Sequence, residues 1–141
     1  MAVKTYDPKK VKIALGSHSV TGLSDTTFLS IEYHGEGVTF KVGCDTEELR
    51  TVDHDHAATI TLTVLMQSPT IAWAQKQYDM DMETCDGDFP VLIKDLRGGL
   101  VFSAQNAWIR VPPGREFSNE SSDREIIIDC GASTWEGELE E

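Results

Sequence analysis

The stretch that decides the fold is ATITLTVLMQSPTIAWAQKQY, residues 58–78, in which an alternating segment runs directly into a helical one. In residues 58–66, Ile60, Leu62, Val64 and Met66 alternate with three threonines at positions 59, 61 and 63. Period two is the repeat of a β-strand, whose successive side chains point to opposite faces. We therefore expect a half-buried antiparallel strand with one apolar face and one polar face.

The second half of this stretch carries the signals of a helix start. Ser68 is of a residue type whose side-chain oxygen accepts from the free amides of a first turn, and Pro69 suits the first helical position because its missing N–H is not needed there. Apolar side chains then recur at spacings of three and four, at Ile71, Ala74, Tyr78 and Met82. The pattern predicts an amphipathic helix that packs by one stripe and ends near Thr84.

Alternating segments on both sides of this stretch predict further strands. Glycine-containing turns separate several of them, as β-hairpins require. We expect three hairpins that pair residues 10–15 with 20–22, 28–34 with 38–42, and 89–93 with 100–111. Residues 125–130, with three consecutive isoleucines, are expected to form the final strand.

The elements together predict a mainly β protein, an antiparallel β-sandwich or barrel of seven or eight strands with one flanking α-helix. The 141 residues fit one domain, 1–141, large enough to bury about two-thirds of its unfolded surface. Residues 43–56 are polar and charged and are expected to form a loop or an extended hairpin arm. Residues 131–141 contain four glutamates and are expected to form a loose acidic tail.

The composition excludes several classes of protein. The net charge of −12 argues against a protein that grips nucleic acid phosphates. No apolar run approaches the roughly 20 residues that cross a bilayer, and the start lacks the apolar block of a secretion signal, so a cytosolic protein is expected. Three widely spaced cysteines without a Cys-x-x-Cys pair are interpreted as ordinary thiols: Cys44, Cys85 and Cys130.

The charge is unevenly distributed along the chain. Residues 1–12 carry four lysines and one aspartate, whereas the remainder carries eight basic and 23 acidic side chains. One interpretation of the basic start is solubility. The other is head-to-tail docking of this start onto an acidic patch of a neighbouring copy.

Two acidic segments could suggest a metal site. Asp53-His54-Asp55-His56 offers imidazole and carboxylate ligands on alternate positions, but two ligands on one face do not complete a site, and nothing fixes the distance to the other histidines, His18 and His34. The acidic run at 79–88 lacks the ligand spacing of a calcium loop. A polar loop and a solvated helix end are the favoured interpretations, and we expect no metal and no cofactor.

No catalytic constellation is present in the sequence. Gly-x-Ser-x-Gly, a phosphate-binding glycine loop and a dinucleotide fingerprint are all missing, and paired carboxylates carry no information in a chain this acidic. We expect no enzymatic activity. Of the tryptophans, Trp108 alternates with apolar residues and is expected in the core, whereas Trp135 is expected either to contact a neighbouring subunit or to fold back on its own domain.

Several segments, taken in order, resemble the tail tube proteins of contractile-tailed bacteriophages. The likeness is good over about residues 4–72 and is limited to the general layout in the remainder. The segments are TYDPKKV at 5–11, GLSD at 22–25 before FLSIE at 28–32, VGCD at 42–45, and TITLTVLMQSP at 59–69.

The resemblance implies a structural virion protein without enzymatic activity or cofactor. Six copies would close into a ring, and stacked rings would form the hollow inner tube that carries the genome to the host inside a contractile sheath. The implied partners are other copies of the chain, the tail sheath, the baseplate and the tape measure protein, with viral DNA passing through the lumen unbound and no membrane partner. The implied location is the virion tail, assembled in the host bacterial cytoplasm.

In this family a long hairpin arm reaches a neighbouring subunit or ring, and the matching segment here is about 41–57. The subunit and ring-stacking contacts are expected at Lys4, Lys9, Lys10, Cys44, Asp45, Glu47, Glu48, Arg50, Asp53 and Trp135. Two alternatives remain open. The chain could be a monomeric β-sandwich that binds a ligand or a metal, or a tail terminator or baseplate hub ring on the same fold.

Overall fold

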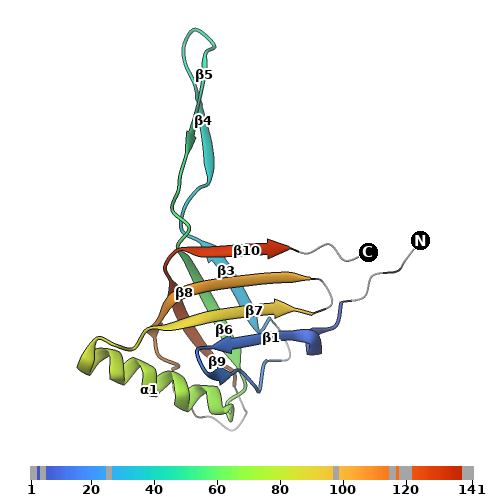
Figure 1. The fold of residues 1–141 in the computed structure, drawn as a ribbon, viewed down its shortest axis with the longest axis vertical. Helices are drawn as coiled ribbons and strands as arrows, with labels where there is room; N and C mark the ends of the chain where they lie inside the picture. The colour runs from blue at the N-terminus through green and yellow to red at the C-terminus, as the bar shows by residue number, and fades with distance from the viewer. Residues whose placement is uncertain are drawn as a thin grey trace.

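The computed structural model describes residues 3, 6–24, 27–96, 99–114, 117 and 122–137. Over these residues the protein is mainly β, with one α-helix at one end and one hairpin projecting from the other (Figure 1). The helical elements are a 3-10 turn, η1 (Pro8–Lys10), and the helix α1 (Pro69–Thr84). The strands are β1 (Val11–Leu15), β2 (His18–Ser19), β3 (Leu29–Tyr33), β4 (Val38–Val42), β5 (Glu48–Val52), β6 (Ala58–Val64), β7 (Phe89–Asp95), β8 (Leu100–Val111), β9 (Arg124–Cys130) and β10 (Ser133–Gly137).

Eight of these strands form one antiparallel sheet that folds over into two layers. The order is β2-β1-β7-β8-β9-β6-β3, with β10 also paired to β8. The long β8 belongs to both layers, because its first half pairs with β7 and β10 whereas its last residues pair with β9. We call β2, β1, β7, β10 and the first half of β8 the front sheet, and the second half of β8 with β9, β6 and β3 the back sheet. The predicted antiparallel sandwich with one helix is confirmed.

The core lies between the two sheets and follows the alternation seen in the sequence. Along β6 the residues Ile60, Leu62 and Val64 are buried, whereas the threonines between them are only partly covered. The largest fully buried side chain is Phe102 of β8. The strand is two residues shorter than predicted, because the Leu65 amide donates to the Gly22 carbonyl (2.7 Å) and the chain then turns toward the helix.

The helix α1 begins and ends where the sequence predicts. Ser68 caps it, since its Oγ accepts the Thr70 amide (3.2 Å) and donates to the Thr21 carbonyl (2.5 Å). Of the predicted apolar stripe, Ala74 is buried and two other members pack against the core, but Met82 is exposed. The prediction for Met82 is wrong because the last turns of α1 extend past the sheets (Figure 1).

The double role of Ser68 gives a stability prediction. Replacing Ser68 by Ala removes the oxygen that caps the helix and leaves the Thr21 carbonyl without this donor, so the free energy of unfolding should fall by about 1–2 kcal/mol. Thermal denaturation followed by circular dichroism measures this change. Gln67→Ala, an exposed neighbour outside the helix, is the control, and an equal loss in both variants would contradict the assigned cap.

Two of the three predicted hairpins are present. β1 pairs with β2, although β2 is only His18–Ser19 and not 20–22, and β7 pairs with β8. The predicted pairing of 28–34 with 38–42 is wrong. Instead β3 pairs with β6, and β4 pairs with β5. The glycines at 35 and 37 do not reverse the chain. Residues 34–37 instead run alongside residues 53–57 and lead away from the sandwich.

The C-terminal segment also differs from the expectation. Residues 131–141 were expected to be a loose tail, and Glu125–Cys130 the last strand, but β10 (Ser133–Gly137) pairs along the edge of β8. The Ser133 amide and hydroxyl both donate to the His56 carbonyl, at 3.1 and 2.8 Å. Residues 138–141 lie outside the described part of the chain. The prediction failed because a strand that lines a sheet edge needs few apolar residues.

Candidate functional site: the arm, the outward face and the apolar groove

A short neck, residues 34–37 and 53–57, carries the hairpin β4–β5 away from the sandwich. The carboxylate of Asp53 accepts the backbone amides of Glu36 (3.3 Å) and Asp55 (3.0 Å), and that of Asp55 accepts the amide of Ala57 (3.0 Å). These carboxylates therefore brace the neck. Among the described residues, no three His, Cys, Asp or Glu side chains form a group that could hold a metal ion.

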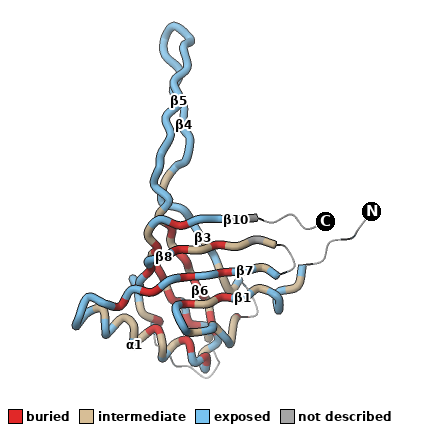
Figure 2. Tube along the Cα trace, in the orientation of Figure 1, coloured by how far each residue is buried: buried red, intermediate tan, exposed pale blue. Residues whose placement is uncertain are grey.

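The hairpin beyond the neck, residues 38–52, is called the arm; it is exposed along its whole length (Figure 2). The arm starts at Val38, three residues before the predicted segment 41–57. Cross-strand partners share a face. We call one face of the arm its apolar face, which consists of the pairs Val38 with Val52, Phe40 with Arg50 and Val42 with Glu48. The opposite face consists of Thr39 with Thr51 and Lys41 with Leu49.

The tip of the arm is a tight turn at residues 43–47. The Gly43 amide donates to the Glu47 carbonyl (2.8 Å), and Thr46 adopts a left-handed conformation with φ of 69°. The Asp45 carboxylate accepts the Glu47 amide (3.4 Å), and the Cys44 thiol is exposed. Residues 36–55 carry six acidic and two basic side chains, so the arm and its neck are strongly acidic.

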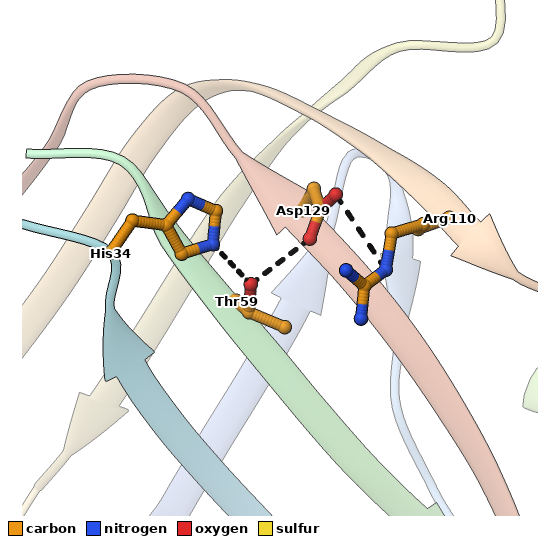
Figure 3. Close-up of polar contacts among 4 residues, drawn as sticks. All are labelled: His34, Thr59, Arg110 and Asp129. Carbon is orange, nitrogen blue, oxygen red and sulfur yellow. Dashed lines mark hydrogen bonds and ion pairs between the residues drawn. The ribbon is translucent and has the colours of Figure 1, made fainter.

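The back sheet has a polar face directed away from the core, which we call the outward face. Figure 3 shows a chain of contacts across it. The Thr59 hydroxyl donates to Asp129 Oδ1 (3.0 Å), and His34 Nε2 lies 2.5 Å from the same hydroxyl. Because a hydroxyl has one proton, His34 must be the donor. Arg110 Nε lies 3.7 Å from Asp129 Oδ2, and its exposure makes this ion pair weak.

The two sheets differ in the charge of their outward-directed side chains. The outward face of the back sheet carries three acids, Glu32, Glu125 and Asp129, with Arg110 as a basic residue. The front sheet places Lys12 opposite Lys94 on its solvent side.

Trp108 also lies on the outward face of the back sheet, with an exposed fraction of 38 %. Its predicted core position is wrong, because its strand neighbours Ala107 and Ile109 are the residues that face the core.

An apolar groove of about 390 Å³ opens at the end of the sandwich where the chain enters β1, between the front sheet and the edge of β3. Its lining is Tyr6, Val11, Thr27, Phe28, Leu29, Ile31, Ile93, Asp95 and Trp135. Trp135 packs edge-on against Phe102, with ring centroids 5.0 Å apart, and remains 43 % exposed. It therefore folds back on its own domain, one of the two expected outcomes, and one side of the ring stays available at the groove.

Two titratable groups have shifted pKa values, the partly buried His18 and the buried Cys130. His18 stacks on Trp73 of α1 (5.1 Å) and contacts the Thr70 hydroxyl (3.0 Å), and its burial lowers its pKa. Burial and the neighbouring Asp129 raise the pKa of Cys130 to about 12, which makes this thiol unreactive. His34 belongs to the neck and His18 lies at the helix end of the sandwich, and among the described residues neither joins His54 and His56 in a group of possible metal ligands.

The contact residues expected from the sequence fall into two groups. Cys44, Asp45, Glu47, Glu48 and Arg50 lie on the arm, with Asp53 in the neck. Lys9 and Lys10 form the exposed turn η1, which lies between two groove residues, Tyr6 and Val11, and Trp135 lines the same groove. Lys4 lies outside the described residues.

Sequence reasoning missed the apolar face of the arm and the groove. The alternation of Val38, Phe40 and Val42 could have indicated the apolar face, but the segment was assigned to the sandwich. The groove is formed by residues distant in sequence, and no local signal marks it.

No known protein-family model matches the chain. It is 29 % identical over 140 residues to Structural protein ORF10 of Pseudomonas phage KPP10, which covers 94 % of this chain and 81 % of the relative. Solved structures that share the fold include a chain of the anti-feeding prophage tube-terminating cap, a chain of the PVC sheath-tube complex of an extracellular contractile injection system in its extended state, and a chain of the PVC sheath/tube terminator, also extended.

The three structural matches extend over nearly the whole molecule. Their TM-scores are 0.63, 0.61 and 0.56, with identities of 14, 12 and 12 %. They cover 98, 94 and 97 % of this chain, and 95, 92 and 100 % of the respective matched chains. The chain has the fold of contractile-system proteins. No helix among the described residues has the length and apolar character needed to cross a membrane.

Proposed function

We propose that this chain is a structural subunit of a contractile phage tail, in which six copies close into a ring and rings stack into the inner tube. The fold likeness and the phage relative named as a structural protein support this function. The observation that carries it is the arm, which holds apolar side chains in solvent, with Phe40 70 % exposed. A two-stranded hairpin is marginal by itself, so a protein that keeps one needs a partner surface.

As a tail subunit, the chain has defined partners and a defined place of action. The subunit contacts other copies of itself, the tail sheath, the baseplate and the tape measure protein, and viral DNA passes through the lumen without specific binding. It acts in the virion tail after assembly in the host bacterial cytoplasm. It performs no catalysis and uses no cofactor.

Within this proposal the outward face of the back sheet lines the lumen. Its carboxylates at Glu32, Glu125 and Asp129 repel phosphates, and the threonines of β6 offer a small uncharged surface. The front sheet, with Lys12 and Lys94 facing solvent, would attract DNA and suits the outside of the tube.

A lysine on the outward face tests this assignment. Thr61→Lys should make assembled tubes retain a fluorescent single-stranded oligonucleotide in a sedimentation assay, and the retention should fall as salt rises, because phosphate contacts release counterions. Wild-type tubes give the background, which includes any oligonucleotide held by Lys12 and Lys94 on the outside. Thr134→Lys on the front sheet is the matched control, and retention equal to that of Thr61→Lys would contradict the lumen assignment.

Negative-stain electron microscopy of the purified protein tests the function itself. Hexameric rings or hollow tubes are expected, and particles that remain monomeric at high concentration would refute the proposal. They would favour the monomeric ligand-binding sandwich, for which titration with zinc or calcium provides the direct test.

A tube terminator is the second candidate, favoured by the likeness to the cap and terminator chains. The copy number per virion separates the two functions, since a terminator is present as one ring and a tube subunit as many. Quantitative mass spectrometry of purified virions against the portal or capsid protein gives this number.

A further inference from the structure

We propose that the arm of one copy docks in the apolar groove of a second copy, with its acidic tip beside the lysines of η1. This inference rests on the proposed self-assembly of the chain. It adds which two surfaces meet and which face of the arm makes the contact.

The arm has one face suited to burial. Four of its six residues, Val38, Phe40, Val42 and Val52, are apolar and each about half exposed or more, and Arg50 and Glu48 are its charged members, whereas the opposite face is mostly polar. β4 and β5 pair only with each other, so the sandwich does not cover this face. Burying this face against another surface would remove the largest exposed apolar area of the arm from water, which is favourable.

The groove offers a matching surface. Its lining is mainly apolar, and its rim includes two aromatic side chains with free surface, Tyr6 at 64 % and Trp135 at 43 % exposed. Exposed aromatic residues around an apolar depression are typical of contact sites. The arm of the same chain projects away from the sandwich (Figure 1), so the occupant that we assign to the groove is the arm of a second copy.

Charge favours the same pairing. The tip of the arm carries Asp45 and Glu47, and Glu48 follows it directly at the start of β5, all three exposed. Lys9 and Lys10 are exposed on η1, and the residues before and after this turn, Tyr6 and Val11, line the groove. An acidic tip seated beside these lysines is electrostatically complementary, which sets register and suppresses wrong pairings.

The pairing also has the right symmetry for a tail. Arm and groove are different surfaces of one chain, so each copy offers one of each and the contact is head-to-tail. Head-to-tail contacts build rings or open helical stacks and do not stop at a dimer.

Cross-linking through the native Cys44 thiol tests the contact. In a Cys85→Ser background, Lys9→Cys should give oxidised dimers and higher oligomers on a non-reducing gel, because the introduced thiol lies beside the arm tip of the next copy. Cys44→Ser should abolish this ladder. Lys76→Cys on the exposed side of α1 is the matched control, and cross-linking there as efficient as at position 9 would overturn the proposal. Cys130 is buried and does not interfere.

The face of the arm is tested by a pair of neighbouring substitutions. Phe40→Asp should reduce assembly at least tenfold in light scattering, whereas Thr39→Asp, on the opposite face, should leave it within a factor of two. Equal effects would overturn the assignment of the apolar face. Circular dichroism of both variants should match the wild type, since neither side chain packs in the sandwich.

A charge swap separates this inference from the proposed function. Lys9→Glu with Lys10→Glu should impair assembly, as should Glu47→Lys with Glu48→Lys, and the four substitutions combined should restore it. Rings in all variants would overturn the arm-to-groove contact but leave the tube function standing. Wild-type protein that never forms rings would instead refute the tube function.

Discussion

Replacing residues 38–52 by Asn-Gly is expected to abolish rings and tubes while leaving the protomer folded. The Asp53 amide already donates to the Gly37 carbonyl (2.7 Å), so a two-residue turn can close the chain at this point without disturbing the neck. The removed strands pair only with each other and contribute nothing to the sandwich core. Assembly should fall below detection in electron microscopy, and the melting temperature should change by at most a few degrees.

Two measurements keep this result interpretable. Far-ultraviolet circular dichroism should retain the helical signal of α1, which establishes that the shortened chain folds. Addition of the shortened protein to wild-type subunits should slow or cap tube growth, because it keeps the groove but lacks the arm. Normal tubes from the shortened chain would refute an assembly role for the arm.

Phe102→Ala is expected to cause the largest loss of stability among single substitutions in the core. Phe102 is fully buried, and it supports the ring of Trp135 at the groove. Removing a buried phenylalanine side chain costs about 3–5 kcal/mol, the sum of lost transfer energy and the cavity left behind. The melting temperature should fall by roughly 10 °C or more.

The same chemical change at an exposed position serves as the control. Phe40→Ala on the arm should alter the free energy of unfolding by less than about 0.5 kcal/mol yet weaken assembly. Both should be measured by urea denaturation at a protein concentration too low for rings, because assembly raises apparent stability by mass action. A loss at Phe40 as large as that at Phe102 would mean that the arm packs on its own sandwich.

Local signals in the sequence predicted local structure well. Ser68 and Pro69 determine the start of α1 by capping, and the alternation along β6 determines which side of this strand is buried. The pairing partners of the strands could not be obtained in this way. Val38–Val42 alternates as a sandwich strand does, and only the neck, in which Asp53 and Asp55 bind backbone amides, shows that this strand leaves the sandwich.

The candidate site was predictable in part for the same reason. The charge excess of residues 43–56 marks an exposed segment, and the lysines of the first 12 residues mark a basic one. The groove beside η1 required the fold, since it joins the chain start, β3, β7 and Trp135. Trp108 was misplaced because alternation along a strand does not by itself say which face meets the core, and here Ala107 and Ile109 occupy the core face.

The late position of β9 and β10 in the chain has a consequence for the timing of folding. β6 pairs with β9, so that Ala58 lies opposite Cys130, and Trp135 of β10 reaches the groove only after that. The arm is a local hairpin and can form as soon as it leaves the ribosome, whereas contacts between distant segments form late. A nascent chain therefore presents an arm without a finished groove. With the proposed docking of the arm in the groove of another copy, chains that still lack β9 and β10 would offer one another no complete groove.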